Sequence, residues 1–185
     1  TIIEYNSNNL AASNNTKVFI SVNNFFSSDN LKIKNLTFKQ TDFRIKKSNF
    51  KFFIDLLNNN KSDYDINFLN SKFFYLDQND DIIFLANLKK LDYLFQDSIL
   101  KKFNSKINIF NIPISLEVKH NISEKKYFTE INSQPLRLNI KDSSNYEGKN
   151  IDGQLDFTII NKNKKINYSL KDNSLNIYTN DKEFT

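Results

Sequence analysis

The stretch that decides the fold is SKINIFNIPISLEVKH, Ser105–His120. Apolar and polar residues alternate over Ile112–Lys119, and a period of two gives a strand one apolar face and one polar face. Upstream the same rhythm runs in the opposite phase, so we expect a bulge at Phe110-Asn111. Sixteen residues at about 3.3 Å each predict a strand of about 50 Å, which needs long partners. The stretch therefore predicts a mainly β protein built on a long, curved antiparallel sheet.

Similar alternation recurs on both sides of this stretch. The other expected strands are 17–26, 31–45, 63–76, 82–95, 127–140, 151–160, 166–170 and 175–178. Short polar connections after the central stretch predict that sequential strands pair antiparallel as a meander. An echo of the form apolar-x-Asn-x-x-Phe in 33–38 and in 68–73 suggests a repeated strand and helix unit.

Two segments favour short helices, near 49–58 and 97–103. In the first, Phe50, Phe53 and Leu57 recur with a helical period, and Asn49 is placed to cap the first turn. In the second, Asp97 can cap a short helical turn. The apolar spacing at the end of the strand predicted over 82–95 also suits a helix, so the boundary between that strand and the helical turn stays open.

The length of 185 residues is sufficient for one domain with a real core. We expect a frayed start at 1–16, a single β domain over 17–180 and a tail at 181–185. Because the chain begins at Thr1 and contains no methionine, we expect it to be a piece of a larger protein, with any targeting segment out of view.

Composition narrows the function classes. The net charge of +5 comes from lysines scattered among acidic residues, which favours a solvated surface over a nucleic-acid site. The 18 phenylalanines fall mostly in phase with Ile and Leu, which favours core positions over a base-stacking surface. Without cysteine, a disulfide scaffold and a cysteine metal site are excluded. With only two glycines, left-handed turn positions should fall mainly to Asn and Asp.

No catalytic constellation is visible. His120 is the only histidine and lies at a predicted strand end, which is typical of a surface histidine. Asp77, Asn79 and Asp80 crowd one turn with oxygen ligands, but the EF-hand positions for Gly and Glu hold Ile82 and Leu88. We therefore predict a solvated hairpin turn there, no metal site, no cofactor and no enzyme activity.

The long sheet itself carries the functional prediction. An apolar face requires a cover, and two short helices hardly supply one. Either the sheet closes into a sandwich or barrel, or an apolar trough of lipid size stays open. The candidate groove residues are Ile112, Ile114, Leu116, Val118, Leu136, Leu138, Ile140, Leu155, Phe157 and Ile159.

Three segments carry a resemblance to a known family. They are IKNLTFKQTDFRIKKSNFKFFIDLL (33–57), DYDINFLNSKFFYLDQNDDIIFLANLKKLDYLF (63–95) and KINIFNIPISLEV (106–118). In order they give a strand, a short helix, a strand, a hairpin and an Ile-Phe-Asn-Ile-Pro strand. The span 31–180 thereby resembles the periplasmic repeating β-groove part of AsmA-like envelope proteins, the group that includes TamB, of the alphaproteobacterial type.

The resemblance implies a β-taco in the periplasm, held by an inner-membrane anchor outside this piece. It implies binding of phospholipid acyl chains and a role in lipid transfer between the inner and outer membranes or in outer-membrane assembly, without catalytic residues. The rival hypothesis is a closed β-sandwich that serves as an adhesin or a structural spacer. A nucleic-acid binder would instead lose affinity steeply with salt.

Overall fold

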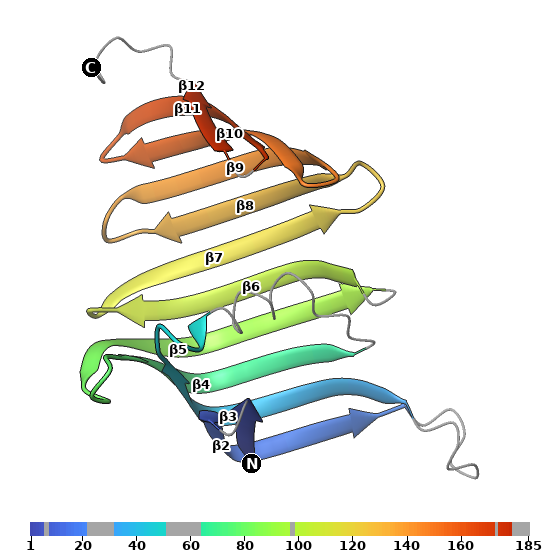
Figure 1. Ribbon diagram of the computed structural model, residues 1–185, viewed down its shortest axis with the longest axis vertical. Helices are drawn as coiled ribbons and strands as arrows, with labels where there is room; N and C mark the ends of the chain where they lie inside the picture. Colours follow the sequence, from blue (N-terminus) through green and yellow to red (C-terminus); the bar gives the residue numbers. More distant parts are fainter. Residues whose placement is uncertain (6–7, 22–31, 51–63, 97–98, 173, 179–185) are drawn as a thin grey trace. The chain divides into compact units, whose positions relative to one another are not determined.

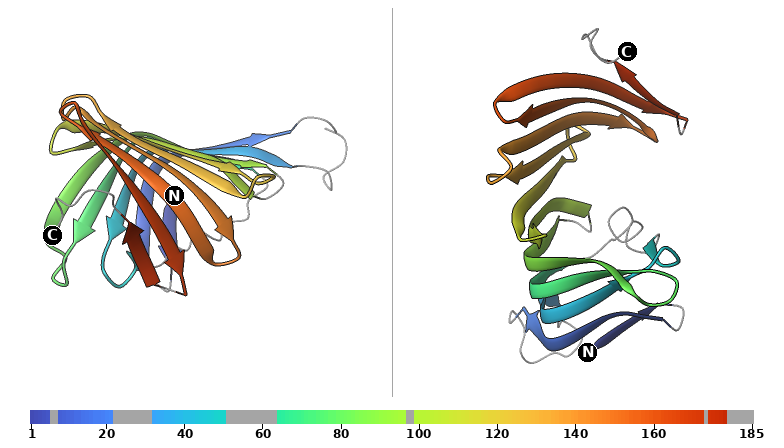
Figure 2. Two further views of the ribbon diagram at one scale, coloured as in Figure 1. Left: turned by 90° about the horizontal axis from the view of Figure 1, so that it is seen from above. Right: turned by 90° about the vertical axis from the view of Figure 1, so that its left-hand side faces the viewer.

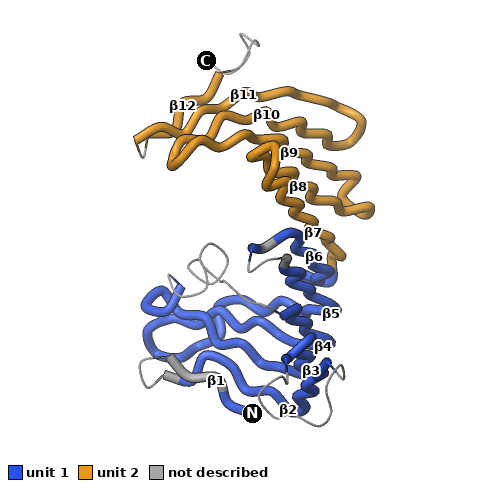
Figure 3. The backbone as a smooth tube through the Cα atoms, turned by 90° about the vertical axis from the view of Figure 1, so that its right-hand side faces the viewer, with its two compact units in different colours: residues 1–111 blue, residues 112–185 orange. Residues whose placement is uncertain are grey.

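The computed structural model describes residues 1–5, 8–21, 32–50, 64–96, 99–172 and 174–178 (Figure 1). All the elements within these ranges are strands, which confirms the mainly β prediction. The chain divides into two compact units, unit 1 over residues 1–111 and unit 2 over residues 112–185 (Figure 3). In both units the strands curve along their length (Figure 2).

Unit 1 is one open, mixed sheet whose strand order follows the sequence. Its strands are β1 (Ile2–Tyr5), β2 (Asn8–Ile20), β3 (Ile33–Ile45), β4 (Asp65–Leu76), β5 (Ile82–Gln96) and β6 (Ile99–Ile109). β1 and most of β2 lie where the sequence predicts a frayed start. The described strands of unit 1 form no closed barrel, because its first strand, β1, does not pair with its last, β6.

One pair in unit 1 departs from the antiparallel prediction. β3 and β4 are parallel, and their partners lie 30 positions apart, from Asn35 with Asp65 to Ile45 with Tyr75. Parallel neighbours cannot be joined by a tight hairpin. The sheet is therefore mixed, with the other pairs of unit 1 antiparallel.

The parallel register stacks phenylalanines on the apolar side of unit 1. Phe38 packs on Phe68 with 5.0 Å between ring centroids, and Phe43 packs on Phe73 at 4.6 Å. Other buried side chains of this unit include Leu88, Leu91, Tyr93 and Phe103.

A line of buried hydroxyls crosses unit 1 where its strands are irregular. Gln40 and Asn70 have φ of 52° and 50° and are 30 positions apart, the same offset as the register. Beside them, the Thr41 hydroxyl donates to Ser13 Oγ at 3.1 Å, and the Thr41 amide donates to Ser71 Oγ at 3.2 Å. These side chains satisfy polar groups that the irregular strands leave outside the regular ladder.

The predicted helix at 97–103 is wrong. Residues from Ile99 onward form β6, which pairs antiparallel with β5 through Leu100 with Phe95 and Phe103 with Tyr93. The Phe103 ring packs edge-on against Tyr93 at 4.9 Å, so burial in the sheet outweighs a local capping signal. The helix predicted at 49–58 lies outside the described residues except for its first two positions.

Unit 2 is an open antiparallel meander, as the sequence predicts, but the single strand predicted over 127–140 is wrong. A turn at residues 134–137 divides that stretch, and strand structure continues to Glu147, beyond the end of the predicted strand. The strands of unit 2 are β7 (Ile112–Asn121), β8 (Lys126–Ser133), β9 (Leu138–Glu147), β10 (Asn150–Ile159), β11 (Lys162–Lys171) and β12 (Ser174–Tyr178). The connections are two to four residues long. Short turns hold each strand beside the one before it.

The single strand predicted over 105–120 is wrong. β6 ends at Ile109 and β7 begins at Ile112, and the two residues between them have φ of 49° and 62°. Two consecutive left-handed residues form a type I′ turn, not a bulge. The change of phase in the sequence marks this turn, which Phe110-Asn111 makes without glycine.

Candidate functional site

The register of unit 2 places nine of the ten candidate groove residues on one side of the sheet. Leu116 pairs with Ile131, which pairs with Ile140, which pairs with Phe157, so one apolar row crosses β7 to β10. Residues two apart along a strand share a face, which puts the rest of the alternating apolar residues on the same side. Leu136 is the exception, because it lies in the turn between β8 and β9 and is exposed.

We call this surface the apolar field. Its residues are Ile112, Ile114, Leu116, Val118, Ile131, Leu138, Ile140, Leu155, Phe157, Ile159 and Ile166. Ile131 and Ile166 join the predicted set through direct pairing with Leu116 and Leu155.

The opposite side of unit 2 is polar. A charged row crosses the sheet through the direct partners Glu117, Glu130, Lys141, Asp156 and Lys165. The amine of Lys141 lies 3.8 Å from Glu130, and the amine of Lys165 lies 3.8 Å from Asp156. A row of charged side chains suits contact with water, so the two sides of the sheet differ sharply in character.

The apolar field is only half-buried. Ile159 is 38 % exposed, and the other field residues are partly accessible. Within the described part of unit 2, extensive packing joins only strands that are neighbours in the sheet, so these strands provide no second layer. A contiguous, accessible apolar surface of this kind marks a site of interaction.

A cluster of rings lies at one end of the field side. His120 stacks on Tyr127 with 4.3 Å between centroids, and the Tyr146 hydroxyl lies 2.8 Å from His120 Nε2. His120 is thus part of an aromatic cluster, which the position of this histidine in the sequence does not by itself reveal. The strand phase could have found it, because Tyr127 and Tyr146 are in phase with the apolar residues of β8 and β9.

A second polar group continues this cluster across the sheet. The Tyr168 hydroxyl donates to Asp142 Oδ1 at 2.8 Å, and Ser144 Oγ donates to Asp142 Oδ2 at 3.1 Å. The Tyr168 ring reaches Asp142 by lying over Gly153, whose added Cβ would be 2.5 Å from Tyr168 Cζ. We call the combined group the hydroxyl band, which consists of His120, Tyr127, Asp142, Ser144, Tyr146 and Tyr168.

Partial burial raises the pKa of two phenols in the hydroxyl band above its ordinary value. For Tyr127 the nearby Tyr146 adds to this effect, and for Tyr168 burial is again the largest cause. Both phenols therefore stay protonated at neutral pH. The band presents neutral hydroxyl groups beside the apolar field.

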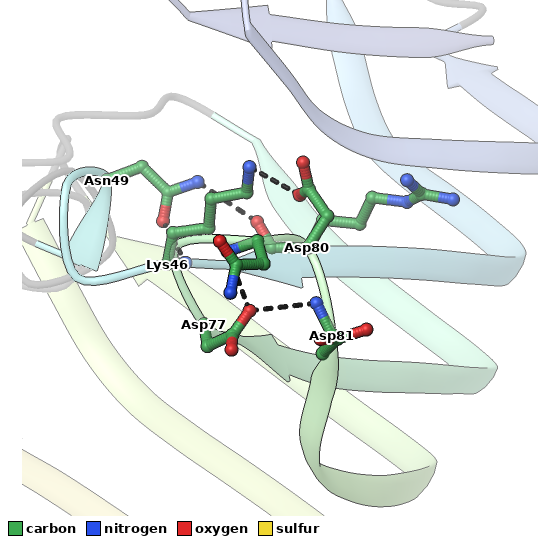
Figure 4. Close-up of polar contacts among 7 residues, drawn as sticks. Lys46, Asn49, Asp77, Asp80 and Asp81 are labelled. Carbon is green, nitrogen blue, oxygen red and sulfur yellow. Dashed lines mark hydrogen bonds and ion pairs between the residues drawn. The ribbon is translucent and has the colours of Figure 1, made fainter.

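The acidic turn predicted between two strands is a hairpin turn (Figure 4). Asp77 Oδ1 accepts the amides of Asn79 at 2.8 Å and Asp81 at 2.9 Å, and Lys46 forms an ion pair with Asp80. These carboxylates are engaged with the turn backbone and with a lysine. Among the described residues, no three His, Cys, Asp or Glu side chains are grouped so that they could hold a metal ion.

The described ranges contain no helix with the length and apolar character that a bilayer crossing requires. Comparisons with protein-family models, curated proteins and solved structures found no match to this chain.

Proposed function

We propose that this chain is a non-enzymatic, AsmA-like segment of an envelope protein, and that its apolar field binds phospholipid acyl chains. The proposed role is lipid transfer between the inner and outer membranes, or support of outer-membrane assembly, with the protein in the periplasm and anchored to the inner membrane. The observation that carries the proposal is the collection of the field residues on one accessible side of unit 2.

The dimensions of the field suit a hydrocarbon chain. Ile112 to Val118 spans six residue steps along β7, or about 20 Å at about 3.3 Å per residue. One leaflet of a bilayer contributes about 15 Å to a hydrocarbon core of about 30 Å. A chain laid along the strands thus remains on apolar side chains over most of its length.

The driving force is removal of apolar surface from water. Each Å² removed from water contributes about 25 cal/mol, whichever acyl chain is bound. Such a surface selects hydrocarbon without selecting one chain, as a carrier of mixed phospholipids requires.

The test is photo-crosslinking of a phospholipid with a reactive group in its acyl chain to the purified chain. Leu116→Asp and Phe157→Asp place a carboxylate in the middle of the apolar row and should each reduce crosslinking at least about tenfold, because a charge cannot be buried against hydrocarbon. Ser115→Asp and Thr158→Asp are the matched controls, one residue away on the polar side, and should crosslink like the parent.

Circular dichroism and urea unfolding establish that each variant is folded. Folded Leu116→Asp and Phe157→Asp proteins that crosslink at the parent level would refute the proposal. Equal losses in the polar-side controls would also refute it, because the apolar field would then not be the site.

A further inference from the structure

The field side of unit 2 is divided along the strand direction. The hydroxyl band crosses the sheet at one end, from His120 on β7 to Tyr168 on β11, and the apolar field occupies the rest. On β10 the direct partner of Ile151 is Tyr146, whereas that of Ile159 is Leu138. A molecule lying along one strand would therefore meet phenol and imidazole groups at one end and aliphatic side chains at the other.

We propose that this surface binds an amphiphile in one polarity, with the polar group at the hydroxyl band and the hydrocarbon running toward Leu138 and Ile159. This inference rests on the proposed function and adds to it the direction in which the lipid lies. The polar group is one with hydrogen-bond acceptor oxygens, as in a phosphoester or a glycerol ester.

The chemistry of the band suits such a group. Tyrosine has an apolar ring and a polar tip, and it favours positions where hydrocarbon gives way to water. Tyr146 and Tyr168 are fixed through hydrogen bonds with His120 and Asp142. The Tyr127 hydroxyl makes no hydrogen bond within the described part of the chain, so its proton is available to an acceptor.

The band is flat where it crosses β10. Gly153 has no side chain, and the flat ring of Tyr168 covers it. The phenol hydroxyls can donate to the oxygens of a polar group, and the Asp142 carboxylate of the band is already engaged by Tyr168 and Ser144.

The opposite polarity has one feature in its favour. Lys162 and Lys164 are the partners of Ile159 and Phe157 on the field side, where their stems can lie along apolar residues while the amines reach water. They come from β11 alone, whereas the hydroxyl band has residues on β7, β8, β9 and β11. We therefore place the polar group at the band, and the experiment decides between the two directions.

The experiment uses the absence of tryptophan from this chain. Ile151→Trp and Ile159→Trp each add one reporter to the field side of β10, eight residue steps apart, or about 26 Å. The ligand is monomeric lysophosphatidylcholine with a nitroxide either on the headgroup or near the end of the acyl chain. Thr158→Trp on the polar side is the control and should be quenched by neither label.

In the proposed polarity the headgroup label quenches Ile151→Trp several-fold more than Ile159→Trp, and the chain-end label does the reverse. A reversed gradient, or equal quenching at the two positions, overturns the polarity and leaves lipid binding intact. No quenching of either reporter by either label overturns the proposed function itself, and the polarity with it.

A second measurement addresses the available hydroxyl. Tyr127→Phe should weaken binding of unlabelled lysophosphatidylcholine about three- to tenfold, the loss expected for one hydrogen bond. Tyr178→Phe, on the polar side of β12, should leave the affinity unchanged. If Tyr127→Phe bound the ligand as tightly as the parent, the hydroxyl band would not be part of the binding site.

Discussion

Several turn residues of this chain adopt a left-handed backbone without being glycine. In the turn between β10 and β11, Ile160 has φ of 46° and Asn161 has φ of 65°. Asn tolerates this region, but a β-branched residue such as isoleucine is strained there. The Ile160 side chain is 63 % exposed, so little burial compensates for the strain.

Ile160→Asn should therefore stabilise unit 2 by about 1 kcal/mol, since a left-handed conformation costs a residue with a Cβ about 1–2 kcal/mol. Urea unfolding followed by circular dichroism measures the change in free energy of unfolding. Thr158→Asn, at an extended position of β10, should not raise the free energy of unfolding. An Ile160→Asn protein no more stable than the parent would show that the turn is not strained.

Tyr93 makes stability sensitive to alkali. Burial raises the pKa of this phenol well above its ordinary value near 10. Above about pH 10 the unfolded chain has lost the Tyr93 proton while the folded chain retains it, so the free energy of unfolding falls as pH rises.

Tyr93→Phe should consequently reduce the loss of stability between about pH 9 and about pH 11, because the group that titrates differently is gone. The urea midpoint at each pH measures this dependence. The exposed Tyr178 provides the control, and Tyr178→Phe should retain the parent slope. If the parent and Tyr93→Phe lost stability equally as the pH rises, Tyr93 would not be the group that causes the loss.

At the scale of elements, hydroxyl groups hold β2, β3 and β4 together where the strands are irregular. Thr41 is fully buried and hydrogen-bonds to Ser13 Oγ through its side chain and to Ser71 Oγ through its amide. Removal of the Thr41 hydroxyl takes away the donor to Ser13 Oγ, a buried group, and leaves the amide bond to Ser71 Oγ in place.

Thr41→Val should destabilise unit 1 by about 1–3 kcal/mol, the cost of an unsatisfied buried group at nearly constant volume. Urea unfolding is again the measurement. Thr158→Val, a strand position of unit 2, is the control and should change stability by less than about 0.5 kcal/mol. Equal effects of the two substitutions would mean that the hydroxyl line contributes little.

Strands β9, β10 and β11 are coupled through a ring that lies over a glycine. Gly153→Ala should destabilise unit 2 by about 1–3 kcal/mol, because its Cβ would overlap the Tyr168 ring. In a Tyr168→Ala background the same substitution should cost much less. A cost that is equal in both backgrounds would show that the ring is not the obstacle.

Across the whole molecule, alternation in the sequence was enough to predict most strands of unit 2 and the common side of Leu138, Ile140 and Phe157. It missed most of β9, because residues 141–147 are largely polar and show no apolar alternation. It could not separate β6 from β7, because Phe110-Asn111 forms a type I′ turn without the glycine that usually marks one. The repeated pattern in the sequence aligns residues 33–38 with residues 68–73, whereas in the structure Phe38 is the partner of Phe68. Spacing alone did not reveal that these two strands would be parallel partners.

The apolar field, and not the net charge of +5, should dominate binding by the whole chain. Affinity for lysophosphatidylcholine, a ligand without net charge, should change less than about threefold between about 0.05 M and about 0.5 M salt. Isothermal titration at several salt concentrations measures this. A steep fall with salt would show that charge interactions with the headgroup, and not the apolar field, dominate the binding.

The 30-residue separation between partners in β3 and β4 also has a kinetic consequence. Hairpins with short turns close in microseconds, whereas pairing of distant segments must first overcome the entropy of a long loop. During refolding from denaturant, unit 1, which contains the parallel pair, should form its sheet later than unit 2. Chaperones should then recognise the strand edges of unit 1 that are still unpaired.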